Sequence, residues 1–334
     1  MKKKYVRFRI GIILMITLAI FLLTGCNDGP ILNASTDYLS ITSTTYIDPN
    51  TEEMTTSIHK YIPSTGELNK VFSFPYTSQY PLGVLSSYDN TVYYTKRDSS
   101  NRDQIYSYNL DTNEEVQLTT ELRAVNQIIP TSDKIFFIAS LDRVLRLGVL
   151  DKMNNIISYW GDEDTNVETM VINPNNQKIY LSVFSYSKDR ENIENQFISG
   201  ENQYKMPLFS IYETDYTFTE TKEMFSACVW IRNLLVNFTN NSVVAIYDEY
   251  YNSDEVSKAI AIDTSSDTIE DFDLPPQRMQ VDGGSFSKDG EGLYVISEIG
   301  DKRGIYYYNF VTKEYTPIFI TEDEFVNNFL FIQD

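Results

Sequence analysis

The sequence of 334 residues contains a single histidine, His59. Metal clusters built on paired histidines are therefore excluded, and only one residue is available as the base of a Ser-His-Asp triad. His59 lies in a strand-like run, so we expect a strand histidine that faces solvent or has its hydrogen bonds satisfied. The chain also lacks a G-x-S-x-G nucleophile elbow and a phosphate-binding P-loop. We predict no catalytic residue, no metal ligand and no cofactor.

Cysteine is almost as scarce, because only Cys26 and Cys228 are present. Cys26 belongs to the N-terminal leader, which leaves Cys228 without a partner for an intramolecular disulfide. The residues around Cys228 are apolar, so we expect it to be a small buried core residue rather than a reactive thiol. Stability must then come from packing and from closure of the architecture.

Basic residues are few: 27 Lys and Arg stand against 47 Asp and Glu, giving a net charge of −20. Such a surface repels nucleic acid and anionic lipid headgroups, so no nucleic-acid partner is expected. Acidic loops such as Asp162–Asp164 and Glu322–Glu324 offer oxygen ligands for calcium. None of them has the spacing of a calcium-binding loop of the EF-hand type, which favours a solvated acidic surface.

Aromatic residues are abundant, with 25 Tyr and 19 Phe, and they favour strands over helices. Short apolar runs separated by polar turns recur along the chain in six units. The third run of each unit ends 40 to 62 residues after the previous one, near Ile62, Leu110, Leu150, Tyr212, Ile262 and Phe310. Most of these gaps fit a four-stranded propeller blade of about 40–50 residues. The sequence therefore predicts an all-β protein with a six-bladed β-propeller rather than a sandwich.

The first unit lacks one strand. It has three runs, Leu39–Ile47, Ser57–Ile62 and Leu68–Phe74, whereas the end of the chain carries a spare apolar run, Phe325–Ile332. A C-terminal strand that completes the first blade would close the ring and remove two exposed sheet edges. We therefore expect the first blade to be closed by Phe325–Ile332.

The leader combines a basic segment, Met1–Arg9, with an apolar run, Ile10–Leu23, that is short for a membrane span of ~20 residues. It ends in Leu23-Thr24-Gly25-Cys26 and resembles the lipobox of bacterial lipoproteins. The resemblance implies cleavage before Cys26, a diacylglycerol on its sulfur and a further acyl chain, such as palmitate, on its amino group. An uncleaved anchor and a cysteine that stands there by chance are the alternatives. We expect a signal peptide at 1–25, a lipidated tether at 26–37 and a propeller domain at 38–334, held at the extracytoplasmic face of the cell membrane.

One turn carries a second resemblance. Ser287-Lys288-Asp289-Gly290 is followed by the apolar run Leu293–Ile296, and Asn173-Pro174-Asn175-Asn176 is a degraded copy of the same turn. This pattern is similar to the repeat of TolB-like six-bladed propellers. The resemblance covers the architecture from about Asp37 onward and transfers no functional residue. TolB-like domains are mostly binding scaffolds, although related propellers include enzymes.

Two aromatic clusters and one insertion are candidates for binding. Tyr250 and Tyr251 follow two carboxylates in a turn-like stretch, where exposed tyrosines could stack on a sugar or contact a peptide. Alternate tyrosines of Tyr306–Tyr308 should instead pack between blades. The polar segment Ser187–Lys205 interrupts the repeat, either as a binding loop or as a tolerated disordered insertion.

These observations predict a membrane-anchored, non-enzymatic propeller that binds a protein, a peptide or an envelope polymer. Two alternatives stay open. An extracytoplasmic enzyme would act on glycans or peptides with acidic residues in the central funnel. An assembly factor would instead use a flat protein-binding face.

Overall fold

The computed structural model describes residues 37–48, 53–77, 81–200, 205–251, 255–280 and 283–333. The chain divides into two units, Met1–Thr36 and Asp37–Asp334. The predictions for the leader, Cys26 and most of the tether therefore lie outside the described residues. In the part of the chain that is described, no helix has the length and apolar character needed to cross a membrane.

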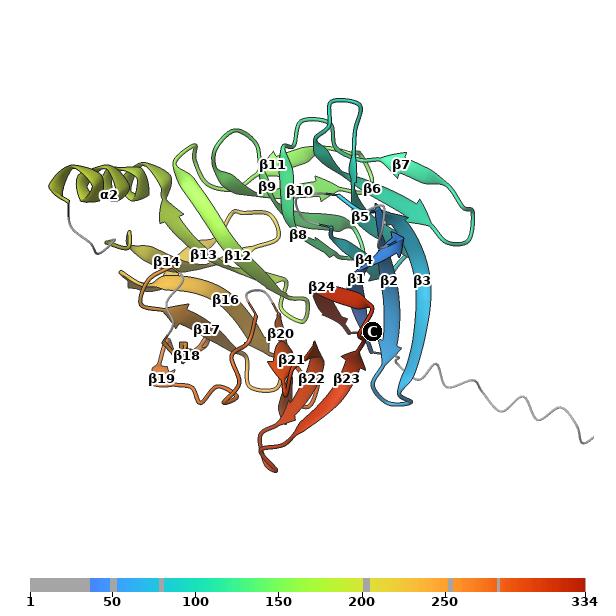
Figure 1. Ribbon diagram of the computed structural model, residues 1–334. Helices are drawn as coiled ribbons and strands as arrows, with labels where there is room; N and C mark the ends of the chain where they lie inside the picture. Colours follow the sequence, from blue (N-terminus) through green and yellow to red (C-terminus); the bar gives the residue numbers. More distant parts are fainter. Residues whose placement is uncertain are drawn as a thin grey trace, which may run out of the picture. The chain divides into compact units, whose positions relative to one another are not determined.

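Six four-stranded antiparallel sheets are arranged in a ring, as the sequence predicts (Figure 1). The first three sheets, each written from its innermost strand outward, are β24 (Glu324–Ile332), β1 (Tyr38–Asp48), β2 (Glu53–Ile62), β3 (Glu67–Pro75); β4 (Gly83–Ser86), β5 (Thr91–Arg97), β6 (Asp103–Asn109), β7 (Glu115–Gln117); and β8 (Ala124–Pro130), β9 (Lys134–Ser140), β10 (Leu145–Asp151), β11 (Ile157–Tyr159).

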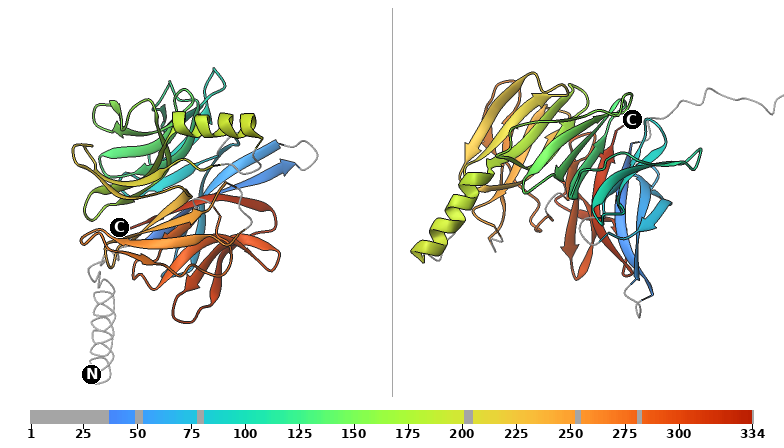
Figure 2. Two further views of the ribbon diagram at one scale, coloured as in Figure 1. Left: turned by 90° about the vertical axis from the view of Figure 1, so that its left-hand side faces the viewer. Right: turned by 90° about the horizontal axis from the view of Figure 1, so that it is seen from above.

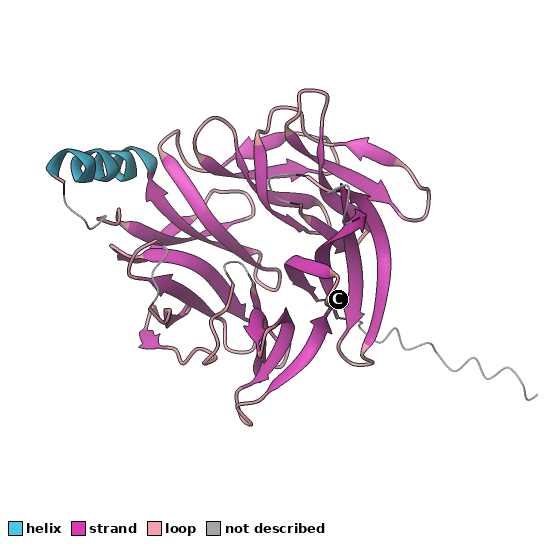
Figure 3. Ribbon diagram, in the orientation of Figure 1, coloured by secondary structure: helices cyan, strands magenta, loops and turns pink. Residues whose placement is uncertain are grey.

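The other three sheets follow in the order of the chain. They are β12 (Thr165–Asn173), β13 (Lys178–Ser185), β14 (Phe209–Asp215), β15 (Thr221–Ala227); β16 (Trp230–Asn237), β17 (Ser242–Asp248), β18 (Lys258–Asp263), β19 (Ile269–Asp271); and β20 (Gly284–Phe286), β21 (Gly292–Ile299), β22 (Lys302–Asn309), β23 (Tyr315–Ile320). Each sheet forms one blade, and strands dominate the described chain (Figure 3).

The ring closes through the two ends of the propeller. β24 pairs antiparallel with β1 from Thr45 opposite Glu324 to Tyr38 opposite Ile332. Val326, Phe329 and Ile332 of β24 are buried. The C-terminal strand is therefore the missing strand of the first blade, and the predicted closure is confirmed.

The core lies between neighbouring blades because successive side chains of a strand point to opposite faces of its sheet. Tyr306 packs in one cluster with Leu235 and Val244 of the fifth blade. Tyr307 lies on the other face of the sixth blade, where its ring centroid is 5.2 Å from that of Tyr294. The predicted alternation of the tyrosine cluster is confirmed.

Turns owe their shape to a few polar side chains. In blades two to six, the turn after the third strand begins with a residue whose side-chain oxygen accepts backbone N–H groups within the turn: Asn109, Asp151, Asp215, Asp263 and Asn309.

In the TolB-like turn, the Ser287 hydroxyl donates to Asp289 and accepts from the backbone N–H of Gly292. Gly290 has φ +73°, and a Cβ there would lie 2.6 Å from Oγ1 of Thr239 in the fifth blade. Glycine is therefore required by both conformation and space.

The insertion between β13 and β14 is neither a long loop nor a disordered segment over most of its length. Tyr186–Ser199 forms the helix α2, capped by the Ser185 side chain at its start and by Gly200 at its end. None of its residues is buried, and it projects from the ring (Figures 1 and 2). The helix could not be recognised in the sequence because polar residues occupy all of its sides, so it has no clear apolar periodicity.

Cys228 is exposed, so its predicted burial is wrong. It lies in the two-residue connection between β15 and β16, where the chain passes from the outer strand of one blade to the innermost strand of the next. Its nearest apolar neighbours, Ala227, Val229 and Trp230, are only partly buried.

Candidate functional site

Four of the innermost strands carry a one-residue bulge at equivalent positions. The extra residue is Asn327 in β24, Asn126 in β8, Glu168 in β12 and Arg232 in β16. A bulge redirects a side chain and interrupts the ladder, and bulges are enriched next to functional sites. The mouth of the ring is thus shaped by the same local device in the first, third, fourth and fifth blades.

The bulges have a sequence signal that the strand prediction missed. At each one, two adjacent polar residues stand between apolar ones, as in Val125-Asn126-Gln127-Ile128 and Ile231-Arg232-Asn233-Leu234. Strict alternation allows only every second residue to be polar on a strand with one buried face. The second polar residue is accommodated by the extra bulged position.

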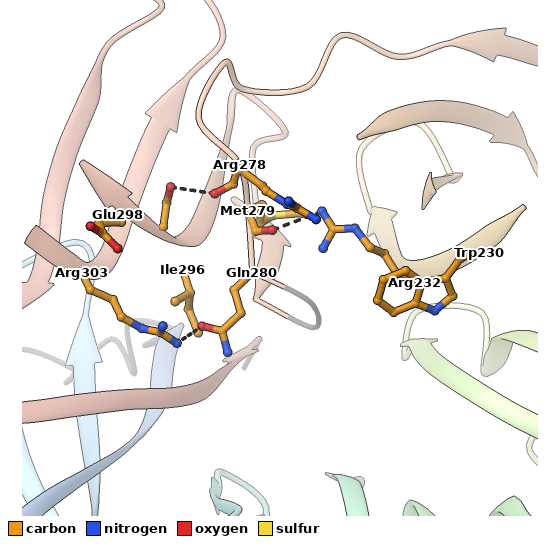
Figure 4. A pocket seen from close by; sticks show the side chains of 9 residues that line it. Trp230, Arg232, Arg278, Met279, Gln280, Ile296, Glu298 and Arg303 are labelled. Atoms are coloured by element: carbon orange, nitrogen blue, oxygen red, sulfur yellow. Dashed lines mark hydrogen bonds between the residues drawn. The ribbon is translucent and has the colours of Figure 1, made fainter. Parts of the chain in front are cut away.

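A cavity of about 340 Å³ opens between the fifth and sixth blades at the level of these bulges (Figure 4). Three arginines line it: Arg232 on β16, Arg278 in the segment before β20, and Arg303 on β22. Figure 4 shows Arg232 and Arg303 approaching from opposite sides. Its other walls are formed by Trp230, Met279, Gln280, Ile296, Ser297 and Glu298. Three guanidinium groups around one hollow form an unusual concentration of positive charge in this acidic chain.

Arg232 is fixed by a buried ion pair. Its Nε lies 3.3 Å from Oδ2 of Asp248, and the side chains of both residues are at most 2% exposed. Its Nη2 donates to the Ser257 hydroxyl at 2.8 Å and to the Met279 carbonyl at 3.1 Å. Nη2 of Arg278 lies 3.6 Å from the same Asp248 oxygen, although the Arg278 side chain is 52% exposed. Asp248 therefore holds one wall of the cavity together.

Arg303 has a different environment. Its Nη2 donates to the side-chain oxygen of Gln280, and its guanidinium lies 4.0 Å from the ring centroid of Phe325. Within the described ranges, no carboxylate lies at ion-pair distance from Arg303, and its Nε is buried without a hydrogen-bond acceptor. Burial lowers the pKa of the Arg303 guanidinium, while Glu298 opposes that shift. The side chains that contact the charged guanidinium of Arg303 are therefore neutral.

An aromatic shelf borders the cavity. Trp230 Nε1 donates to Glu168 at 2.8 Å, and the ring of Tyr251 meets that of Trp230 edge-on at 5.1 Å. Tyr250 and Tyr251, the predicted ligand-binding tyrosines, are both partly buried against the cluster between the fourth and fifth blades. Tyr251 therefore contacts the cavity wall at Trp230. Burial raises the pKa of the Glu168 carboxyl.

His59 lies at the closing seam, where its ring centroid is 5.1 Å from that of Phe319 in the sixth blade. Its Nε2 is 3.0 Å from Ser43 Oγ and 3.2 Å from Glu324 Oε2, and the Ser43 hydroxyl donates to Glu324. Both partners meet the same ring nitrogen, so the acid does not orient the imidazole for proton abstraction from the serine. His59 is a satisfied strand histidine, as expected.

The central channel holds a smaller cavity of about 120 Å³ at the opposite end of the innermost strands. Its described lining consists of apolar, amide and hydroxyl side chains and includes Gln127, Met170, Asn233, Ser285 and Phe329. No acidic residue is among them, so this part of the funnel does not supply the carboxylates that the enzymatic alternative invokes. Among the described residues, no three His, Cys, Asp or Glu side chains are grouped to hold a metal ion.

Comparison with known proteins identifies the fold. No family model matches the chain, and no curated protein matches it. TolB from Acinetobacter baumannii superposes with a TM-score of 0.57 at 13% identity, covering 87% of this chain. This chain spans 66% of that TolB chain. The protein therefore has a TolB-like six-bladed propeller fold.

Two further solved structures share this fold. Oligogalacturonate lyase from Vibrio parahaemolyticus gives a TM-score of 0.51 at 15% identity, with 86% of this chain and 74% of that one covered. An oligogalacturonate lyase in complex with manganese gives 0.51 at 14% identity, with 86% and 75% covered. At such identities the likeness concerns the fold alone.

Proposed function

We propose that this protein is a lipoprotein of the extracytoplasmic membrane face whose propeller binds a protein, a peptide or an envelope polymer at the arginine-lined cavity. The observation that carries the proposal is the cavity itself. It combines a concave surface, a partly exposed indole and three guanidinium groups in a chain whose net charge is −20. Aromatic and arginine side chains in such hollows are typical anchors of binding sites.

A binding role is favoured over catalysis by how the charged groups are used. Arg232 and Asp248 neutralise each other, and Arg303 is held by neutral partners. The cavity lining itself contains one carboxylate, that of Glu298, which is exposed. Acid–base chemistry needs at least one positioned group with a pKa near the working pH, whereas recognition needs only complementary charge and shape.

The binding role is tested by crosslinking whole cells and capturing the full chain. The chain has two tryptophans, which provide a matched pair. Trp230 lines the cavity, whereas Trp160 packs 5.8 Å from Tyr212 away from it. We expect Trp230→Ala to lose the crosslinked partner and Trp160→Ala to keep it, with both variants folded by thermal melting. If both variants capture the partner equally well, the cavity is not the binding site.

The anchor is tested separately at Cys26. Cys26→Ser should leave an unprocessed precursor that takes up no lipid label, because the thioether cannot form without the sulfur. Metabolic labelling with a fatty acid and electrophoretic mobility measure both effects. Unchanged mobility together with unchanged labelling would contradict the anchor.

A glycan-acting enzyme is the second candidate, and Glu168 is the observation that favours it. Burial raises the pKa of its carboxyl, and it contacts the cavity through Trp230. A carboxyl with a raised pKa can act as a general acid or base near neutral pH. If the protein shortens acidic oligosaccharides, Glu168→Gln should abolish the activity, measured by chromatography of the products. Absence of any product with the unmodified protein would leave the binding role.

A further inference from the structure

We infer that the cavity between the fifth and sixth blades binds a single carboxylate group of its ligand and that Arg303 is the residue that binds it. This inference rests on the proposed binding function and specifies the chemistry of its ligand. The inference rests on a difference between the three arginines around the cavity, namely whether a carboxylate of the chain lies close to the guanidinium group.

Arg232 is already neutralised. Its side chain is 2% exposed, its Nε lies at ion-pair distance from Asp248, and its Nη2 donates to Ser257 and Met279. The negative charge of Asp248 largely cancels that of Arg232, so the pair attracts an incoming anion much less than a guanidinium without a countercharge does. Arg232 is therefore a wall of the cavity and not its binding group.

Arg303 is not neutralised in this way. Its guanidinium contacts an amide oxygen of Gln280 and the face of Phe325, both without formal charge. Burial lowers the pKa of this guanidinium, which is therefore partly dehydrated while its hydrogen-bond acceptor and its aromatic neighbour are both uncharged. A carboxylate that enters the cavity would supply the countercharge that Arg303 lacks, and its planar shape matches the guanidinium fork. Gln280 and Phe325 keep the fork in place before the ligand arrives.

Arg278 extends the positive surface. Its side chain is 52% exposed and shares Asp248 at 3.6 Å with the buried Arg232. It lies on the segment before β20, whereas Arg303 lies on β22, so the two approach the cavity from different elements (Figure 4). Arg278 thus strengthens the field felt by an anion that enters toward Arg303.

The size and charge of the site limit the ligand. About 340 Å³ is near the lower end of small-molecule sites and fits a group of about one residue. Polyanions are disfavoured because the chain carries a net charge of −20 and Glu298 stands in the cavity wall. A dianionic phosphate meets the same repulsion more strongly than a carboxylate does. A compact group with one carboxylate satisfies these limits.

Arg146 provides a matched control. It donates to the Gly161 carbonyl at 2.8 Å and lies 5.5 Å from the ring of Tyr159, so it too combines a neutral acceptor with an aromatic face. It belongs to β10 of the third blade and is absent from the lining of the arginine cavity. Substitution at Arg146 removes the same charge from the protein without touching the cavity.

The test uses the full chain in detergent and pairs of small ligands that differ in one charge. N-acetylglycine is compared with its amide, glucuronate with glucose, and inorganic phosphate serves as the anion without a carboxylate. Dissociation constants are measured by ligand-observed NMR and calorimetry. We expect at least one carboxylate to bind tenfold or more tightly than its uncharged analogue and more tightly than phosphate. The better pair tells whether the carboxylate belongs to an amino acid or to a sugar.

The variants then locate the binding group. Arg303→Gln should weaken the carboxylate at least tenfold and leave the uncharged analogue unchanged, whereas Arg303→Lys should recover part of the loss. Arg146→Gln should bind as the unmodified chain does, and thermal melting verifies folding of all three. Equal affinity for charged and uncharged analogues, tighter binding of phosphate, or equal losses at Arg303 and Arg146 would overturn the inference.

The two proposals fail in different ways. If Trp230→Ala abolishes partner capture but no carboxylate binds, the binding function stands and the carboxylate inference is wrong. If a carboxylate binds through Arg303 but capture does not depend on Trp230, the proposed partner binding at the cavity is wrong while the carboxylate site stands.

Discussion

The closing seam and the arginine cavity both place polar groups inside the propeller, and they treat them differently. At the seam, Ser43, His59 and Glu324 satisfy one another, and the Thr44 hydroxyl donates to Asn327 at 2.8 Å. At the cavity, the charged guanidinium of Arg303 contacts the neutral side chains of Gln280 and Phe325. The polar groups of the seam therefore serve to join strands, whereas the guanidinium of Arg303 in the cavity has no countercharge from its own chain among the described residues.

This difference gives a physical criterion for separating structural from functional polar clusters. Buried polar groups are nearly always hydrogen-bonded, so a complete network needs no explanation beyond stability. An incomplete one costs free energy that the rest of the fold must offset. The following changes test the criterion at the seam and at the cavity.

The largest effect is expected at the seam. Deleting Phe325–Asp334 removes β24, exposes the edge of β1 and uncovers the cluster around Leu39 and Ile41. We expect a chain that aggregates, measured by size-exclusion chromatography and circular dichroism, because the ring is left open. A truncated chain that melts as the full chain does would show that closure contributes little.

A single substitution on the same strand gives a graded version. Phe329 is 7% exposed and Phe325 is 49% exposed. Phe329→Ala should lower the free energy of unfolding by about 3–5 kcal/mol, whereas Phe325→Ala should change it much less. Similar losses for both would mean that burial on β24 is not what stabilises the ring.

The next effect is expected at the neutralised wall of the cavity. Asp248→Asn leaves the Arg232 guanidinium buried without its countercharge. Breaking a buried ion pair costs about 3–5 kcal/mol, so denaturant unfolding should show a large loss of stability. Arg303→Gln is the contrasting variant, and it should leave stability close to that of the unmodified chain. If the two losses are alike, Arg303 is as structural as Arg232.

The smallest effect is the pH dependence of the seam. Burial lowers the pKa of His59 below its ordinary value of about 6.5, while Glu324 partly offsets the shift and Lys70 adds to it. The unfolded chain therefore takes up a proton before the folded chain does, and stability falls as pH drops below about 6.5. The slope from this one group cannot exceed about 1.4 kcal/mol per pH unit.

His59→Gln isolates this contribution. Urea unfolding of the unmodified chain and of the variant should give stability curves that diverge between pH 7 and pH 5, with the unmodified chain losing more on acidification. Carboxylates away from the seam contribute equally to both curves, so the difference belongs to His59 and its contact with Glu324. Parallel curves would mean that the histidine titrates alike in the folded and unfolded chains.

The sequence predicts the blades because each blade is a local object. Strand runs, turn residues and the spare run Phe325–Ile332 can be read within windows of about 50 residues, and the six units and the closure followed from them. Cys228 was misplaced because apolar neighbours indicate burial only where the strand continues. The helix α2 was missed because helices without an apolar face leave no periodic signal.

The arginine cavity could not be predicted in the same way. Trp230 and Arg303 lie more than 70 residues apart and meet only when two blades stand side by side. Whether an arginine is neutralised depends on which carboxylate the fold brings near it, as Asp248 is brought to Arg232. The adjacent polar residues at the bulges were the signal in the sequence that could have pointed to the mouth of the ring.

The two cavities described above open at opposite ends of the innermost strands. Tyr38 pairs with Ile332, which borders the channel cavity, whereas Trp230 at the start of β16 borders the arginine cavity at the other face. The two faces of the ring are therefore chemically unequal: one opens on guanidinium groups and an indole, the other on apolar, amide and hydroxyl side chains.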